Sequence, residues 1–137
     1  MRLFVDTSGF KAFYDNSDRH HSRATKFIQE LRERRLPYTF VFTSDYIFDE
    51  TVTLIRMAHS HANAVKFGEA VLASRIINLV KLDDEVVHAA WILFKKYHDK
   101  AFSFTDCTSF ALMKQMGVQD AFAFDKNFEQ AGFRMLP

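Results

Sequence analysis

The sequence has little cysteine, proline and glycine, and each scarcity excludes a class of structure. One cysteine among 137 residues cannot form an internal disulfide, so disulfides do not hold the fold together. Two prolines and four glycines leave no linker-like or low-complexity segment, which predicts short connections. No apolar run approaches the roughly eighteen residues of a membrane span. We therefore expect one domain, residues 1–137, with no membrane segment.

The chain also lacks a secretory signal and an excess of charge. The apolar stretch from Met1 to Val5 reaches Asp6 too soon to serve as a signal peptide, which together with the single thiol predicts a cytoplasmic protein. A formal net charge of +1 gives no global attraction to nucleic acid, so any such binding must come from local patches. Two basic clusters are candidates, although a solvated helix face explains either: Arg23, Lys26, Arg32, Arg34 and Arg35, and Lys95, Lys96 and Lys100.

What the chain does have is apolar residues, at 48%, including sixteen phenylalanines, which predicts a single core packed by aromatic rings. Strand-like runs alternate with helical patterns, the signature of a three-layer α/β/α sandwich with a mainly parallel central sheet. The expected strands are 3–5, 39–43, 76–82 and 121–124, and the expected helices are 20–35, 45–59, 61–74, 84–97 and 106–116.

Two of the apolar runs stop on an aspartate, the first on Asp6 and the last on Asp125. Ligands of open parallel sheets bind outside the carboxyl ends of the strands, so both carboxylates are expected at the ligand edge. Each aspartate taken alone is explained equally well as the N-cap of a following helix. Their shared position nevertheless makes both candidates for a site.

Glu50 is a candidate for a different reason. In the expected helix Tyr46 and Leu54 lie four residues and Met57 seven residues from Glu50, which predicts that its carboxylate lies on an apolar face. A charge on such a face needs a partner. Asp49 lies off that face and reads as a solvated residue, so the pattern favours Glu50 as the site acid.

Asp106 has a strong structural explanation, because Ser103 and Asp106 fit a capping box before an apolar helix. As an isolated observation, capping wins. The set shifts the balance, because three aspartates lie at element starts or strand ends and one glutamate is expected to face inward, in a fold whose strand ends converge. Four carboxylates brought together are stable at neutral pH only when protons or cations compensate them. An all-oxygen set favours Mg²⁺ or Mn²⁺. Zinc is disfavoured, since no histidine pair has a suitable spacing and surface positions explain the histidines better: His20, His21, His59 and His61.

At this point the chain resembles the PIN-domain family of ribonucleases, especially the single-domain VapC-type toxins of toxin–antitoxin pairs. The resemblance runs nearly end to end and rests on the order and spacing of several short motifs. These are Val5-Asp6-Thr7-Ser8, Ser44-Asp45-Tyr46 with Asp49-Glu50-Thr51, Ser103-Phe104-Thr105-Asp106 with Ser109-Phe110-Ala111-Leu112-Met113, and Ala123-Phe124-Asp125-Lys126-Asn127-Phe128.

The resemblance implies that four acids bind the metal: Asp6, Glu50, Asp106 and Asp125. It also implies hydroxyl support from Ser8 and Thr105, a doubly wound fold, dependence on Mg²⁺ or Mn²⁺ and cleavage of RNA. An antitoxin protein and a second copy of the chain are the expected partners. Some relatives carry a further acid where this chain has Asn127, which leaves a second metal position open.

The expected chemistry is hydrolysis of an RNA phosphodiester by a metal-activated water, with Asp6 and Asp106 as principal ligands. An aspartyl-phosphate enzyme is the rival, but that pattern wants an acid where this chain has Ser8. Cys107 has no evident histidine partner in its motif and is expected to be a buried structural residue. The remaining alternative is a catalytically silent module that binds RNA or protein through the same fold.

Overall fold

The structure, a computed structural model that describes residues 1–137, is built around one five-stranded parallel sheet. The strand order is β3-β2-β1-β4-β5, and every neighbouring pair is parallel. The strands are β1 (Arg2–Val5), β2 (Phe40–Ser44), β3 (Ile77–Val80), β4 (Asp120–Phe122) and β5 (Arg134–Leu136). Because β1 lies at the centre and the chain adds strands on both of its sides, the sheet is doubly wound.

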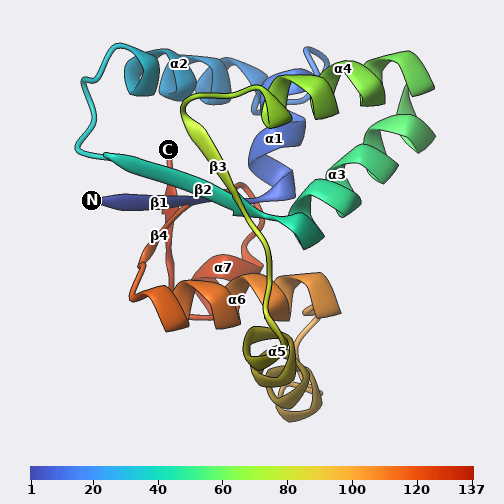
Figure 1. Ribbon diagram of the computed structural model, residues 1–137, viewed down its shortest axis with the longest axis vertical. Coiled ribbons are helices and arrows are strands. Elements are labelled where there is room, and N and C mark those ends of the chain that lie inside the picture. The colour runs from blue at the N-terminus through green and yellow to red at the C-terminus, as the bar shows by residue number, and fades with distance from the viewer.

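Helices cover both faces of the sheet, which confirms the predicted three-layer α/β/α architecture (Figure 1). One layer contains α1 (Thr7–Tyr14), α2 (His21–Arg32), α3 (Asp45–Ala58) and α4 (His61–Leu72). The other contains α5 (Asp84–Lys96), α6 (Phe104–Met116) and the short α7 (Asn127–Gln130), with α5 packed on α6. None of these helices combines the length and the apolar character that a bilayer crossing requires.

The four predicted strands and five predicted helices are all present, with ends shifted by a few residues. Three short elements were not expected: α1, α7 and β5. Each has at most eight residues, too few to show a clear period in the sequence. Helix α6 begins at Phe104 rather than Asp106, because its N-cap is Ser103.

Aromatic rings pack the core, as the phenylalanine content predicts. Phe4 and Phe42 on adjacent strands meet edge to face with their centroids 5.5 Å apart. On the α2 side of the sheet Phe27 stacks on Phe122 at 4.9 Å. Such ring pairs contribute about 0.5–1.5 kcal/mol beyond the area they bury. They fix the sheet and its covering helices as a rigid support for the strand ends.

Candidate active site

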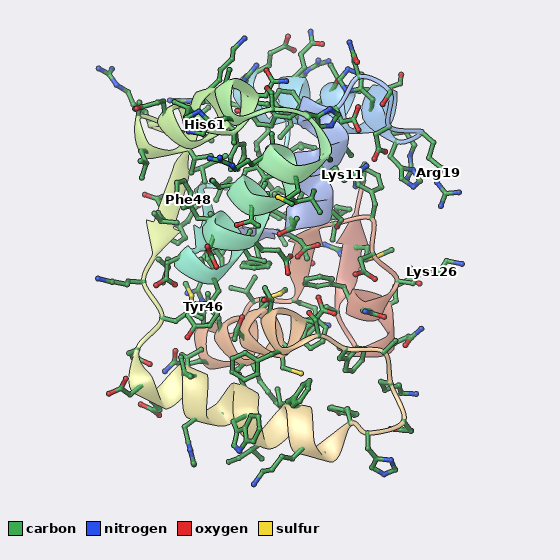
Figure 2. All side chains as sticks on the ribbon, turned by 90° about the vertical axis from the view of Figure 1, so that its right-hand side faces the viewer. Lys11, Arg19, Tyr46, Phe48, His61 and Lys126 are labelled. Atoms are coloured by element: carbon green, nitrogen blue, oxygen red, sulfur yellow. The ribbon has the colours of Figure 1, made fainter.

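The central strands β1 and β4 end side by side. Val5 is in register with Phe122, and the backbone N–H of Asp6 donates to the Phe122 carbonyl at 3.1 Å. The residues that follow the two strands therefore emerge at one edge of the sheet, the ligand edge of a doubly wound fold. Figure 2 views the molecule from this side.

Asp6 is buried at this edge, with 4% of its surface exposed, and Ser8 holds it in place. The Ser8 hydroxyl donates to Asp6 Oδ2 at 2.6 Å, and the Ser8 N–H donates to the same oxygen at 3.0 Å, capping α1. The Ser8 hydroxyl in turn accepts from the N–H of Phe124 at 3.0 Å. One serine thus connects the ends of both central strands.

The electrostatic environment of Asp6 opposes its charge. Burial is the main cause that raises the pKa of Asp6 to about 7, against the lowering effect of the Ser8 hydrogen bonds. The negative charges of Asp106 and Glu50 raise the pKa further. Asp6 is therefore a carboxylate whose ionised form needs a cation that the protein itself does not supply.

Asp106 lies at the start of α6 and forms the predicted capping box. Its Oδ2 accepts from the N–H of Ser103 at 3.0 Å, while its own N–H donates to Ser103 Oγ at 2.9 Å. Asn127 Nδ2 donates to the same Oδ2 at 3.0 Å. Burial chiefly raises the pKa of Asp106, and the charge of Asp125 adds to the increase. These acids are near enough to repel one another.

Asn127 was noted in the sequence only as a departure from a family pattern, and its structural role was missed. Its backbone N–H donates to Asp125 Oδ1 at 3.0 Å, and its side-chain amide bonds both Asp106 and the carbonyl of Ala101. The contact with Asp106 crosses from α7 to α6, so no local pattern could reveal it. Asn127 holds two of the predicted site acids in fixed positions.

Each of the three aspartates is bonded through one carboxylate oxygen. The protein's hydrogen bonds reach Asp6 and Asp106 at Oδ2 and Asp125 at Oδ1. The second oxygen of each side chain accepts no hydrogen bond from the protein. The same aspartate can therefore cap a helix through one oxygen and bind a ligand through the other. From the sequence alone these two roles were weighed as alternatives.

Glu50 does not lie on a core-facing apolar side of α3, so the prediction drawn from its helical spacing is wrong. The buried face of α3 carries Ile47, Thr51 and Ile55, whereas Leu54 is 36% and Met57 80% exposed. The stripe that contains Glu50 therefore does not face the core. The prediction failed because a pattern of apolar residues in the sequence does not show which side of a helix other elements cover.

The position of Glu50 still brings it to the site. Its charge contributes to raising the pKa of Asp6, and it is half-buried whereas Asp49 is exposed. One residue further along, the buried Thr51 hydroxyl donates to Thr7 Oγ1 at 3.0 Å and fixes α3 against α1. This bond anchors the Glu50 turn of α3 beside Asp6.

Thr105 contributes through its backbone, since its carbonyl accepts from the Thr108 hydroxyl at 2.6 Å. Its side chain forms no hydrogen bond with an acid, so the support predicted from Thr105 stays a prediction. Cys107 is fully buried, and burial together with the charge of Asp106 raises the pKa of its thiol. A thiol in this environment is not an activated nucleophile, as the sequence predicts.

The donor set fits a hard divalent cation by its chemistry. No lysine, arginine or histidine forms an ion pair with any of the four acids, so their charge is uncompensated. All the available donors are oxygens, the ligands that Mg²⁺ and Mn²⁺ prefer. As the side chains stand, no three of them close into a metal-binding group.

Comparison with known proteins gives one consistent family. The family model described as PIN domain matches residues 3–134. The 23S rRNA-specific endonuclease VapC20 of Mycobacterium tuberculosis is 33% identical over 131 residues, covering 96% of this chain and 95% of the relative. A VapC ribonuclease of Archaeoglobus fulgidus is 30% identical, covering 93% and 80%.

Solved structures agree with this comparison. The crystal structure of M. tuberculosis VapC20, described as a sarcin-ricin loop cleaving toxin, has a TM-score of 0.85 at 32% identity, and 96% of each chain is covered. FitAcB of Neisseria gonorrhoeae has a TM-score of 0.71 at 15% identity, covering 98% of this chain and 96% of that one. The second likeness bears on the fold alone.

Proposed function

The chain belongs to the PIN-domain family, and from that premise we propose that it is a metal-dependent endoribonuclease that hydrolyses RNA phosphodiester bonds. The observation that carries the proposal is the arrangement at the strand ends. Asp6 is buried among uncompensated acids, and each of three aspartates is held through one oxygen while the other accepts no bond from the protein. The relatives named as ribonucleases supply the substrate class.

Asp6 and Asp106 are the principal ligands in this proposal, and Glu50 and Asp125 complete the acid set. When bound, Mg²⁺ or Mn²⁺ would supply the charge that lowers the pKa of an attacking water and stabilises the leaving oxygen. Ser8 fixes Asp6, and Asn127 fixes Asp106 and Asp125, so the ligands are oriented before substrate arrives. No protein nucleophile is required, which agrees with the buried thiol of Cys107, whose pKa is raised by burial and by the charge of Asp106.

A protein partner is part of the proposal. The relative of known structure is described as a toxin, and VapBC-1 of nontypeable Haemophilus influenzae is a similar solved structure at 13% identity. We expect this chain to be the toxin of a toxin–antitoxin pair. A small adjacent gene that encodes a DNA-binding protein, together with co-purification of that protein with this chain, would support this role. The absence of such a partner would count against it.

A second copy of the chain is the other expected partner. Trp91 and Ile92 on α5 are each 49% exposed, and Phe94 is 39% exposed. Large apolar side chains gathered on one helix are typical of an interface. Light scattering after size-exclusion chromatography should give the mass of a dimer, and Trp91→Ser should shift it toward the 16.0 kDa monomer.

The nuclease proposal is tested with purified protein, labelled RNA and Mn²⁺ or Mg²⁺. Asp6→Asn and Glu50→Gln should abolish cleavage, whereas the neighbouring exposed Asp49→Asn should retain it and serves as the matched control. Chelation of the cation should have the same effect as Asp6→Asn. Cleavage that survives chelation and Asp6→Asn would contradict the proposal, while binding without cleavage in any metal would favour the silent module.

A further inference from the structure

Beside the acids lies a stacked surface that we call the Phe124 shelf, formed by Arg19, His20, Phe124 and Lys126. The His20 ring stacks on the Phe124 ring with centroids 4.5 Å apart and planes 9° from parallel. Arg19 Nε donates to His20 Nε2 at 3.1 Å, which brings the guanidinium beside the ring pair. Lys126 is exposed and follows directly after Asp125.

The shelf is anchored from beneath, so its rings hold one position. The guanidinium of Arg23 lies 5.6 Å from the centroid of the Phe124 ring, and Phe122 meets the same ring edge to face at 5.8 Å. The His20 N–H donates to Asp18 Oδ1 at 2.8 Å at the start of α2. A preorganised flat surface loses little conformational entropy when a ligand stacks on it.

The shelf borders the acid site directly. Phe124 and Lys126 flank Asp125 in the chain, and the Phe124 N–H donates to the Ser8 hydroxyl that holds Asp6. Figure 2 shows Arg19 and Lys126 on the same side of the face at which the strands end. A ligand bound at the acids would therefore lie next to the shelf.

The positively charged side chains of the shelf do not pair with carboxylates. Arg19 and Lys126 form no ion pair, whereas Lys11 nearby is bound to Asp18 at 2.6 Å. Acids at the site repel the phosphates of an approaching RNA, and uncompensated cations next to the acids would offset this repulsion. Arg34 and Arg75, by contrast, lie at the loops near the opposite, amino ends of the strands.

We propose that the Phe124 shelf binds the nucleotide flanking the scissile phosphate in single-stranded RNA, with its base stacked on His20 and its phosphate held by Arg19 and Lys126. Bases of single-stranded RNA stack on aromatic rings, and guanidinium and ammonium groups bind phosphate. An acidic protein segment would use the charges but not the ring surface, so the combination favours a nucleotide. The inference rests on the proposed ribonuclease function.

The test measures RNA binding without cleavage, in the Asp6→Asn background with Mg²⁺. The probe is a fluorescein-labelled single-stranded RNA of about twelve nucleotides. We expect Arg19→Ala with Lys126→Ala to weaken binding at least about tenfold and to reduce the salt slope of log K by about 1.4, two phosphates at about 0.7 each. The matched control, Arg34→Ala with Arg75→Ala, removes the same charge far from the site. It should change the RNA affinity and the salt slope less than the shelf variant does.

The ring is tested separately from the charge. His20→Ala should weaken binding and lower the fluorescence quenching of a 2-aminopurine base in the probe, whereas His20→Phe should retain both. Far-ultraviolet circular dichroism of each variant checks that the fold is intact. Equal losses in the shelf and control variants would overturn the proposal, as would shelf variants that bind RNA normally but fail to bind a partner protein.

This result is independent of the nuclease test. If the wild type does not cleave RNA in any metal but the shelf variants lose RNA affinity, the enzymatic proposal fails and the shelf remains an RNA-binding surface with no scissile phosphate beside it. If the wild type cleaves and the shelf variants bind and cleave as it does, the shelf proposal fails alone.

Discussion

The side-chain amide of Asn127 donates to Oδ2 of Asp106 at 3.0 Å, a bond that joins α7 to the first turn of α6. The same residue donates its backbone N–H to Asp125. The neutral side-chain amide orients Asp106, and the backbone N–H orients Asp125, without a third negative charge between the two acids.

We therefore expect Asn127→Ala to lower cation affinity or kcat about 10- to 100-fold, as is typical when a group that orients metal ligands is removed. Asn127→Asp should be a different variant, because an added carboxylate repels Asp106 in the free protein but offers the cation another oxygen. Isothermal titration with Mn²⁺ and cleavage assays measure both effects. Unchanged affinity and rate in Asn127→Ala would show that the contact is not needed.

A second prediction separates stability from activity at Asp6. The carboxylate is buried, and burial with two neighbouring acids opposes its ionisation. In the absence of divalent cations at pH 8, Asp6→Asn should stabilise the protein by an amount on the order of a few kcal/mol, since the amide removes the buried charge and still accepts from Ser8.

Thermal unfolding with and without Mn²⁺ tests this expectation. The wild type should gain stability from the ion, whereas Asp6→Asn should gain little. Ser22→Ala, an exposed substitution on α2, controls for general effects of mutation. A lower melting temperature of Asp6→Asn in chelator would mean that the acid is compensated within the protein.

The fold was predictable because its signals are local and repeated. The central strands contain uninterrupted apolar runs and the helices between them have clear periods, so the alternation predicts an α/β sandwich with a mainly parallel sheet. The doubly wound topology was expected only from the family resemblance. The ends of elements depended on caps such as Ser103, which the capping-box pattern did identify. Short α1 and α7 had no such signal, although they carry Ser8 and Asn127.

The site was only partly predictable, for a physical reason. Asp6 and Asp125 follow from strand ends, whereas Glu50 was grouped with them by the family resemblance and not by the helical stripe, and in the structure its charge acts on Asp6. The stripe failed because burial is decided by which elements pack on α3, a long-range property. The contacts of Asn127 with Asp106 and of His20 with Phe124 are also long-range, so no spacing in the sequence could indicate them.

A pH prediction concerns Asp120, at the far end of β4. Burial alone would raise the pKa of Asp120, but hydrogen bonds from Arg134 and Tyr38 outweigh burial and hold the pKa below its usual range. Arg134 donates at 2.9 and 2.6 Å, and the Tyr38 hydroxyl donates at 2.6 Å. Because the pKa is lower in the folded state, this stabilisation is present above the unfolded pKa and is lost as pH falls through the folded pKa.

Asp120→Asn should therefore lower the free energy of unfolding by about 1–2 kcal/mol at pH 7, a value reduced because water screens the exposed Arg134. The difference in unfolding free energy from the wild type should shrink as the pH falls below 3.8, the ordinary aspartate pKa.

At alkaline pH, burial and then the bond to Asp120 raise the pKa of Tyr38 to about 12. The stabilisation by Tyr38 is therefore complete up to about pH 10 and is lost as the pH rises toward 12. Urea unfolding of Asp120→Asn and Tyr38→Phe across pH measures both limits. A difference that does not vary with pH would contradict the assignment.

The last prediction uses two glycines that look alike in sequence and differ in space. A Cβ atom on Gly9 in α1 would lie 2.6 Å from the Phe122 carbonyl oxygen and 2.7 Å from the Phe122 ring. That carbonyl also accepts from the Asp6 N–H, so relief of the clash must move α1 together with Asp6. Gly9→Ala should destabilise the protein by about 1–3 kcal/mol and lower nuclease activity more than its loss of folded protein explains.

Gly68 in the middle of α4 is the matched control. A Cβ atom there would meet the tip of the Phe48 ring at 3.4 Å, an ordinary contact with a movable side chain. Gly68→Ala should therefore stabilise α4 by about 0.5–1 kcal/mol and leave activity unchanged. Chemical unfolding gives both free energies, and cleavage rates are compared per folded molecule. Equal behaviour of the two variants would mean that the close packing of α1 on β4 is not what positions Asp6.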